Sequence, residues 1–475
     1  MFRVYVRLAS DLLESVTVGR NVRSNLTLTA GLLTVLMSAA LPLATAPENN
    51  GRFFALDNGM RVFLHEKHDL PLLHIVTGFD VGSKNETDET SGLVHLLEHC
   101  ILFRGTSARS GAEVSADIRR HGAYFNASTG QDLSLFEISL PAEYAGFALR
   151  NQKDILFGLD LSPAELEGEK DIVLEEYSQM EDDPQRNAVD LVLQDLFKGH
   201  SYGRSVYGRR EVIRTATAQA LLAFYRKYFV ADNCALAVVG DFATSDMERR
   251  IRDVFGSLPR TGFFPERFPV ALPLKKAAVR RFERDVEDGY LFIGFVAPDY
   301  NNADHYAMNV LAEVLGRGVH PLLPARLQES RAMIQTVSMA YLALRFGGAG
   351  VVSIKMDPRE LPAVQRVALS FLKQAQNEAF SKKDFLGEAE FAAFDYLESA
   401  KNQIRFAVGQ AEESGLQLAG SLARHILLNT RDKPRRYLDE IREVDSSDLR
   451  KVAGRYLGKG EYAIVSIVPQ KGGKK

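Results

Sequence analysis

Hydrophobic and polar residues alternate along the first part of the chain in patterns that predict strands and helices in turn. Residues 53–65 alternate around Asn58-Gly59, a pair typical of a two-residue hairpin turn. Residues 72–81 form an apolar run that predicts a buried strand, and residues 88–91 offer caps for the helix that follows. Further helices are expected over 111–121, 142–159, 162–181 and 217–228, a second hairpin over 122–140, and a strand over 234–239.

The pattern begins again after residue 274. The segment before it, residues 256–273, bears Pro and Gly and is typical of a linker. Residues 294–295 repeat the Gly-Phe pair of residues 78–79, and a helix expected over 307–315 then matches the helix that follows the first pair. The sequence therefore predicts an internal duplication. The remaining elements expected are strands over 337–344, 350–354 and 462–468, and helices over 361–380, 383–400, 412–428 and 446–457.

Length and composition narrow the class of protein. A chain of 475 residues with 46% hydrophobic and 25% charged residues is ordinary for a globular protein of two or three domains. The net charge is −3 and no long basic run occurs, so we expect neither nucleic acid nor an anionic membrane surface as a partner. The two cysteines, Cys100 and Cys234, cannot build a disulfide framework, and the sequence leaves open whether they pair.

The first 46 residues have the pattern of a targeting segment. Four arginines precede residue 26, residues 26–46 carry no charge, and Ala44 and Ala46 form an A-x-A end. Because a basic lead, an apolar stretch and such an end are typical of a secretory signal peptide, we expect export to the periplasm. A mitochondrial transit peptide and an uncleaved membrane anchor formed by residues 26–46 are the alternatives. We expect no membrane-spanning segment after residue 46.

Residues 92–99 read G-L-V-H-L-L-E-H and carry the clearest chemistry of the chain. Positions three and four apart on a helix share a face, so His95, Glu98 and His99 project from one side of one turn. Two imidazoles at this spacing can bind one metal ion, and the carboxylate can take a proton from metal-bound water. The order H-x-x-E-H is the inverzincin pattern of zinc sites. It is expected by chance on the order of 0.02 times in a chain with 10 histidines, which makes two structural histidines the weaker interpretation.

A third ligand must come from elsewhere, because hydrolytic zinc sites use three protein ligands and leave one position for water. The helix expected over 162–181 offers candidates, since it carries Glu165, Glu167, Glu169, Glu175 and Glu176. Glu176 lies seven residues after Glu169 and shares its face. The pattern alone does not choose between Glu175 and Glu176, and a run of acidic residues on a helix is more often a solvated face.

Three segments resemble signatures of one family. Residues 81–106, with the H-x-x-E-H helix and the F-R-G-T that follows it, resemble the family's metal-site signature. Residues 122–129 resemble its G-x-x-x-N-A-x-T segment, and residues 169–176 resemble its E-R-x-x-V-x-x-E helix. The body of the chain, from about residue 52 to residue 468, thus resembles the pitrilysin/insulinase metallopeptidases of the shorter type. That type includes the mitochondrial processing peptidase and its bacterial relatives.

The resemblance implies a fold and an assembly. The fold is α+β, with two homologous α/β-sandwich halves, each a mainly antiparallel sheet packed with helices, joined by a linker as half of a clamshell. Short members of the family often pair with a second chain, so we expect a homo- or heterodimer with a related chain. The expected division is a targeting segment over 1–46, an N-terminal metallopeptidase domain over 52–255, a linker over 256–274 and a C-terminal duplicate without a metal site over 275–470.

The resemblance also implies the roles of the acidic residues. Glu176 takes the position of the third ligand to a single Zn²⁺, and Glu169 takes a position that orients a ligand. Glu98 acts as general base on metal-activated water. The implied activity is that of a zinc-dependent endopeptidase that hydrolyses unfolded or extended peptides inside a chamber.

Substrate contacts follow from the same family pattern. Asn126 and Ala127 would offer a sheet edge to which an extended peptide adds as a strand. Arg331 matches an arginine that holds substrate, whereas Gln335 stands where a tyrosine is expected, and a partner chain is expected to supply that contact. The alternatives are a non-catalytic or partner-dependent subunit of a peptidase pair and a metal hydrolase that acts on other substrates.

Overall fold

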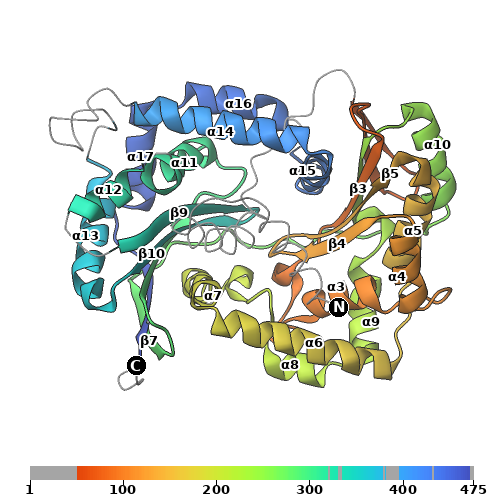
Figure 1. The fold of residues 1–475 in the computed structure, drawn as a ribbon, viewed down its shortest axis with the longest axis horizontal. Coiled ribbons are helices and arrows are strands. Elements are labelled where there is room, and N and C mark those ends of the chain that lie inside the picture. The colour runs from red at the N-terminus through yellow and green to blue at the C-terminus, as the bar shows by residue number, and fades with distance from the viewer. Residues whose placement is uncertain are drawn as a thin grey trace, which may run out of the picture.

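The computed structural model describes residues 51–318, 321–329, 334–377, 380, 395–430 and 433–470 (Figure 1). The predicted targeting segment and Arg331 lie outside the described residues, as does most of the helix expected over 383–400. In the described part of the chain, no helix is long and apolar enough to cross a lipid bilayer.

The first half contains a six-stranded sheet with the order β1-β2-β6-β3-β5-β4. The pair β2 and β6 is parallel and the other neighbours are antiparallel. Both hairpins expected from the sequence are confirmed, and Gly59 supplies the positive φ of 91° that the first turn requires. Strand β4 lies at an edge of the sheet. The strands are β1 Gly51–Ala55, β2 Arg61–Glu66, β3 Leu72–Phe79, β4 Tyr124–Thr129, β5 Ser134–Pro141 and β6 Cys234–Gly240.

The second half contains a five-stranded sheet with the order β7-β11-β8-β10-β9. It repeats the order and directions of β2-β6-β3-β5-β4, including the one parallel pair, which confirms the predicted duplication. The positions that match His95, Glu98 and His99 are the buried apolar residues Leu311, Val314 and Leu315. The strands are β7 Ala278–Arg284, β8 Gly289–Ala297, β9 Ile334–Leu344, β10 Gly347–Met356 and β11 Ala463–Pro469.

Helices cover both sheets. Those of the first half are α3 Leu93–Phe103, α4 Gly111–Arg120, α5 Ala145–Phe157, α6 Pro163–Asp182, α7 Pro184–Leu196, α8 Arg210–Thr215, α9 Ala218–Tyr228 and α10 Thr244–Phe255. Those of the second half are α11 His305–Ala312, α12 Leu322–Glu329, α13 Leu361–Gln374, α14 Tyr396–Glu413, α15 Gly415–Leu427, α16 Lys433–Glu443 and α17 Ser446–Tyr456.

The sequence-based elements differ from these helices in several places. The pattern did not predict α7, α8, α10, α12 or α16. Helix α10 nevertheless buries Met247, Ile251 and Phe255 at a spacing of four, a signal that the sequence contains. The boundary expected between residues 400 and 412 is wrong, because α14 continues to Glu413 and α15 begins after Ser414.

Each half gives one helix to the sheet of the other. Helix α15, in blue in Figure 1, packs on β3 and β6 of the first sheet. Helix α7 packs on β8 and β11 of the second sheet, where Val192 lies so close to Gly294 that any side chain there would collide with it. Since both faces of each sheet are covered, the central strand β6 is buried along its whole length. The division at residues 256–274 stays a prediction, and α7 and α15 pack across it.

A buried cluster of charged residues joins the halves, and we call Asp80, Lys84, Asp132 and Arg345 the ion cluster. Arg345, in the turn between β9 and β10, places Nη1 2.6 Å from Asp80 Oδ2. Lys84 Nζ lies 3.0 Å from the other oxygen of Asp80. The backbone amide of Arg345 donates to Asp132 Oδ2 at 2.9 Å. Because Asp80 and Lys84 lie between β3 and α3, the ion cluster connects the second half to the segment that leads into α3.

Candidate metal centre

The N-terminus of helix α3 is not capped by residues 88–91, so that prediction is wrong. Its N-cap is Gly92, at φ 101°, and no side chain of that segment caps it. The cap comes from the buried carboxylate of Glu86, which accepts hydrogen bonds from Gly92 N at 2.9 Å and Val94 N at 2.8 Å. Glycine is required at position 92, because a side chain there would meet Gly208 and Ile213 and the backbone is left-handed. Every residue of α3 from Leu93 to Ile101 is buried.

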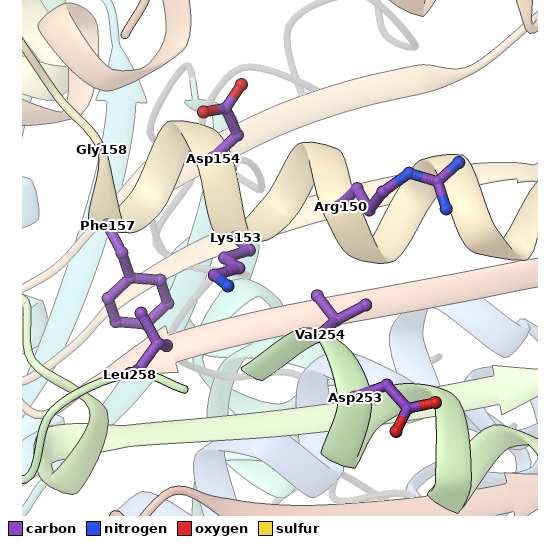
Figure 2. Close-up of a pocket in the computed structure, with 8 residues that line it drawn as sticks. All are labelled: Arg150, Lys153, Asp154, Phe157, Gly158, Asp253, Val254 and Leu258. Carbon is purple, nitrogen blue, oxygen red and sulfur yellow. The ribbon is translucent and has the colours of Figure 1, made fainter. Parts of the chain in front are cut away.

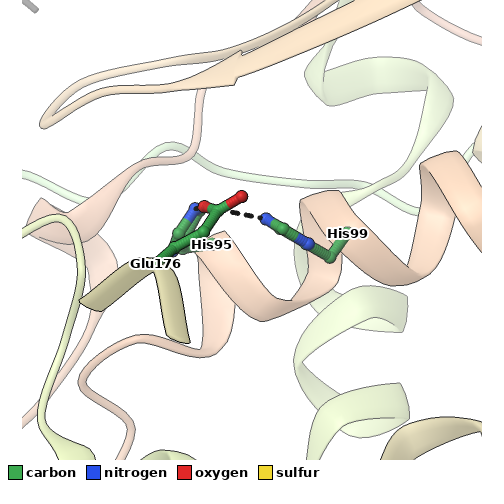
Figure 3. Close-up of side chains that lie close together, drawn as sticks. All are labelled: His95, His99 and Glu176. Atoms are coloured by element: carbon green, nitrogen blue, oxygen red, sulfur yellow. Dashed lines mark ion pairs between the residues drawn. The ribbon is translucent and has the colours of Figure 1, made fainter. Parts of the chain in front are cut away.

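Three predicted ligands meet between α3 and α6 (Figure 3). Glu176 Oε2 lies 3.7 Å from His95 Nε2 and 3.5 Å from His99 Nε2. In the described part of the chain, these three residues form the one group of His, Cys, Asp or Glu side chains whose possible ligand atoms all lie within 4.8 Å of one another. Glu175, the candidate that the pattern could not exclude, is exposed and accepts instead from Gln179 Nε2.

The geometry and chemistry of this group fit zinc. Bonds of about 2.0–2.2 Å in a tetrahedral site put the ligand atoms roughly 3.3–3.6 Å apart. The separations of 3.5 and 3.7 Å are close to this, and two imidazoles with one carboxylate are a donor set that hydrolytic zinc sites use. The histidines are buried, whereas 41% of the Glu176 side chain is exposed, so the group is open to solvent on the side of Glu176.

Glu169 lies behind one of the histidines. Its Oε2 is 3.4 Å from His99 Nδ1, and its Oε1 is 2.5 Å from Arg104 Nε. With only 1% of the side chain exposed, this carboxylate is surrounded by protein. A carboxylate on the far nitrogen of a metal-binding histidine fixes the tautomer and the ring orientation. Glu169 therefore lies beside the far nitrogen of His99, and its orienting role stays a prediction.

Glu98 shares the face of α3 that carries the two histidines and is buried. Burial raises its pKa, and interactions with Thr129 and His99 offset only part of that effect. Thr129 is the last residue of the edge strand β4, so this carboxyl group lies between the histidines and the edge of the sheet. A carboxyl group with a raised pKa is suited to accept a proton near neutral pH.

The three side chains of the group differ in pKa. Burial, with a smaller contribution from His99, lowers the pKa of His95 to about 4. Burial alone would lower the pKa of His99 as well, but the carboxylates of Glu169 and Glu176 outweigh it and raise that pKa to about 9. The hydrogen bond from His99 is the main cause that lowers the pKa of Glu176. At neutral pH the metal-free group therefore holds one proton on His99.

Zinc affinity is consequently expected to rise with pH. The ion must displace the proton on His99, whose pKa is about 9, so affinity should increase up to about tenfold per pH unit between pH 6 and 8. Competition titrations against a chelator of known pH dependence measure this slope. An affinity that is flat over that window would contradict the assignment of the proton to a ligand.

The predicted substrate residues are only partly accounted for. Asn126 and Ala127 lie on the edge strand β4, with Asn126 exposed and Ala127 buried. Arg331 lies outside the described residues, and Gln335 donates to Asp288 Oδ1 at 2.5 Å. Their predicted roles in substrate binding stay predictions. The two cysteines, left open above, are both buried and free.

Three residues that the structure brings to the site had no role assigned from the sequence pattern. These are Glu86, which caps α3, Arg104, which pairs with Glu169, and Tyr207, whose ring contacts His95. None belongs to the H-x-x-E-H pattern, and only Arg104 follows it closely. A separate pocket of about 470 Å³ lies between the ends of α5 and α10 and shares no residue with the metal centre (Figure 2).

The fold matches those of solved proteins of one class. A protease from Helicobacter pylori superposes with a TM-score of 0.78 at 21% identity, over 88% of this chain and 99% of that protein. A peptidase M16 inactive domain protein from Pseudomonas fluorescens gives 0.77 at 19% identity, over 90% of this chain and 99% of that protein. The fold is thus that of the M16-like peptidases.

The particular family follows from the sequence comparisons. The insulinase model (peptidase family M16) matches residues 63–210, and the model of the peptidase M16 inactive domain matches residues 215–389. This chain belongs to the insulinase family, peptidase family M16. The second match begins within the first half and includes Leu311, Val314 and Leu315, the apolar residues at the positions of the histidine motif.

Two relatives span most of the chain. The uncharacterized zinc protease YmxG of Bacillus subtilis (strain 168) is 24% identical over 422 residues, which are 88% of this chain and 98% of YmxG. The mitochondrial-processing peptidase subunit beta of Lentinula edodes is 22% identical over 425 residues, which are 87% of this chain and 88% of that subunit.

Proposed function

We propose that this protein is a zinc-dependent endopeptidase that hydrolyses unfolded or extended peptides. The observation that carries the proposal is the convergence of His95, His99 and Glu176 at ligand spacing, with the buried Glu98 on the same helix face. The names of its relatives as zinc proteases support the choice of metal and of reaction.

The residues of the centre would divide the chemistry among them. His95, His99 and Glu176 would hold the ion, which supplies Lewis-acid polarisation of a water molecule and of the scissile carbonyl group. Glu98 accepts the proton of the attacking water and later donates it to the leaving amine. Its pKa, raised by burial, supports both steps. Glu169 keeps the His99 ring oriented.

An edge strand beside the centre supports the choice of substrate. Among the described strands, β4 pairs with β5 alone, so its other side can hydrogen-bond to an extended peptide. A peptide added to β4 would run past Thr129, next to Glu98. Backbone pairing of this kind accepts many sequences but requires an unfolded chain, so Asn126 and Ala127 are proposed as part of the substrate-binding edge.

Partner and location belong to the same proposal. Gln335 stands where the family pattern has a tyrosine and is engaged with Asp288, which favours a homo- or heterodimer in which a related chain completes substrate binding. One relative is named as a subunit of a processing peptidase, which supports a pair and also the alternative of a partner-dependent subunit. Residues 1–46 are proposed to direct export to the periplasm.

The identity of the third ligand gives a direct test of the proposed site. Glu176→Gln should lower bound zinc from about one ion per chain to well below one and abolish peptide cleavage, because it removes a charged ligand. Glu175→Gln is the matched control, since its carboxylate is one residue away and outside the group. It should retain zinc and cleavage.

Metal analysis after dialysis, together with a peptide-and-ester substrate panel, reads out both variants. Zinc loss in Glu175→Gln alone would overturn the ligand assignment. A wild-type protein that binds zinc but cleaves only esters would overturn the peptidase assignment.

A further inference from the structure

The two metal-binding histidines differ in what lies beside their far ring nitrogen, because a carboxylate lies near that of His99 alone. A histidine that binds metal almost always donates its other ring N–H to a carboxylate, a carbonyl group or water. The Glu169 carboxylate lies 3.4 Å from His99 Nδ1 as an ion pair, although neither atom makes a hydrogen bond. His95 Nδ1 is buried and has neither a hydrogen-bond partner nor an ion-pair partner among the described residues. In that part of the chain, packing against neighbouring rings is therefore the contact that can set the rotation of the His95 ring.

The ring of Tyr207 packs against His95. The two centroids are 5.6 Å apart and the planes make an angle of 88°, the edge-to-face arrangement that aromatic pairs favour. Such a contact restricts rotation of the imidazole about its Cβ–Cγ bond, because turning the ring would drive its edge into the phenol. Tyr207 comes from the segment between α7 and α8, and no motif or comparison assigns it a role.

The backbone holds Tyr207 firmly against helix α3. The next residue, Gly208, lies at φ 79°, and a Cβ there would be only 2.2 Å from the Cα of Gly92 at the start of the helix. Arg209 N donates to Ser91 O at 3.2 Å. The position of Tyr207 is thus fixed relative to the helix that carries His95.

We propose that Tyr207 is a positioning residue whose ring holds His95 in the rotation that points Nε2 at Glu176. This inference rests on the proposed zinc site and adds a residue to it. The aromatic ring of Tyr207 holds the His95 ring in place, because the phenol oxygen makes no hydrogen bond to His95 or to Glu176. Phenylalanine should therefore replace Tyr207, and an aliphatic residue should not.

Cobalt titration of the metal-free, full-length protein tests the proposal without an activity assay. Tyr207→Leu should weaken Co²⁺ binding about 10–100-fold, the usual effect of losing a residue that orients a ligand. It should also change the visible d–d spectrum, which reports coordination geometry. Tyr207→Phe should keep the wild-type affinity and spectrum.

Tyr144→Leu serves as the matched control, because Tyr144 packs edge-on against His121, a histidine outside the centre. It should not change Co²⁺ affinity. Circular dichroism verifies folding, and Tyr207→Met replaces the leucine variant if that variant does not fold.

The outcomes separate this inference from the proposed function. A wild-type protein that binds no Co²⁺ would overturn the zinc site itself. Wild-type affinity and spectrum in the aliphatic variant would overturn only the positioning role of Tyr207. A phenylalanine variant as weak as the leucine variant would also overturn it, because the hydroxyl group and not the ring would then be required.

Discussion

Replacing Glu98 by Gln is expected to lower kcat for peptide hydrolysis about 10²–10⁴-fold, the range over which a general base contributes to catalysis. The side chain keeps its size and its place on α3, so zinc content and thermal stability should remain those of the wild type. The carboxyl group is buried and is not one of the three converging side chains, and this separates loss of the proton acceptor from loss of the metal.

The pH dependence of activity at acid pH gives a second test of Glu98→Gln. Burial raises the pKa of Glu98, so activity of the wild type should fall as the pH drops through a value above that of an ordinary glutamate. The residual activity of Glu98→Gln should not show this fall. Unchanged cleavage in a variant that retains zinc would refute the role of Glu98 as base.

Replacing Arg345 by Met is expected to reduce the free energy of unfolding by about 3–5 kcal/mol, the range measured when one partner of a buried ion pair is removed. Only 14% of the Arg345 side chain and 6% of the Asp80 side chain are exposed, so little water can replace the lost contact. Urea unfolding of the metal-free protein, in the presence of a chelator, measures the loss without a contribution from zinc binding.

Two further variants make the prediction for Arg345 specific. Arg436→Met removes an exposed pair on α16 with Glu440 and should cost no more than about 1 kcal/mol. Combining Arg345→Met with Asp80→Asn should cost less than the sum of the two single changes, because the carboxylate that loses its contact with Arg345 is then gone. Additive losses would show that the ion cluster does not act as a unit.

The ion cluster also predicts a pH dependence. Burial alone would raise the pKa of Asp80, but the charges of Lys84 and Arg345 outweigh it and lower that pKa below that of an ordinary aspartate. A carboxyl group with a lowered folded-state pKa stabilises the fold above its unfolded pKa, and that stabilisation is lost as the pH falls through the folded value. The difference between wild type and Arg345→Met should therefore shrink below about pH 4.

The sequence predicted the parts of this protein that depend on local spacing. His95, Glu98 and His99 are separated by three or four residues, so helical geometry alone puts them on one face. The duplication was also predicted, and the strand order of the second sheet repeats that of five strands of the first. Spacing alone did not identify the third ligand, because Glu175 and Glu176 fit the helical pattern equally well. The resemblance to a family decided between them.

The features that the sequence did not predict depend on contacts between distant segments. The pattern predicted a helix over most of α15 but did not predict α7, and it does not show that each of these helices packs on the sheet of the other half. Glu86 caps α3 from outside the helix, which excludes it from rules that search adjacent positions. Arg345 and Tyr207 reach the segments around α3 through the tertiary fold alone, so no spacing in the chain marks either of them.

The most direct test of the proposed zinc site is anomalous diffraction at the zinc edge from crystals of the zinc-loaded protein. The expected result is one peak per chain, within bonding distance of His95 Nε2, His99 Nε2 and a carboxylate oxygen of Glu176. A peak at another place, or a bound ion with Glu176 turned away and no other acidic side chain in reach, would contradict it.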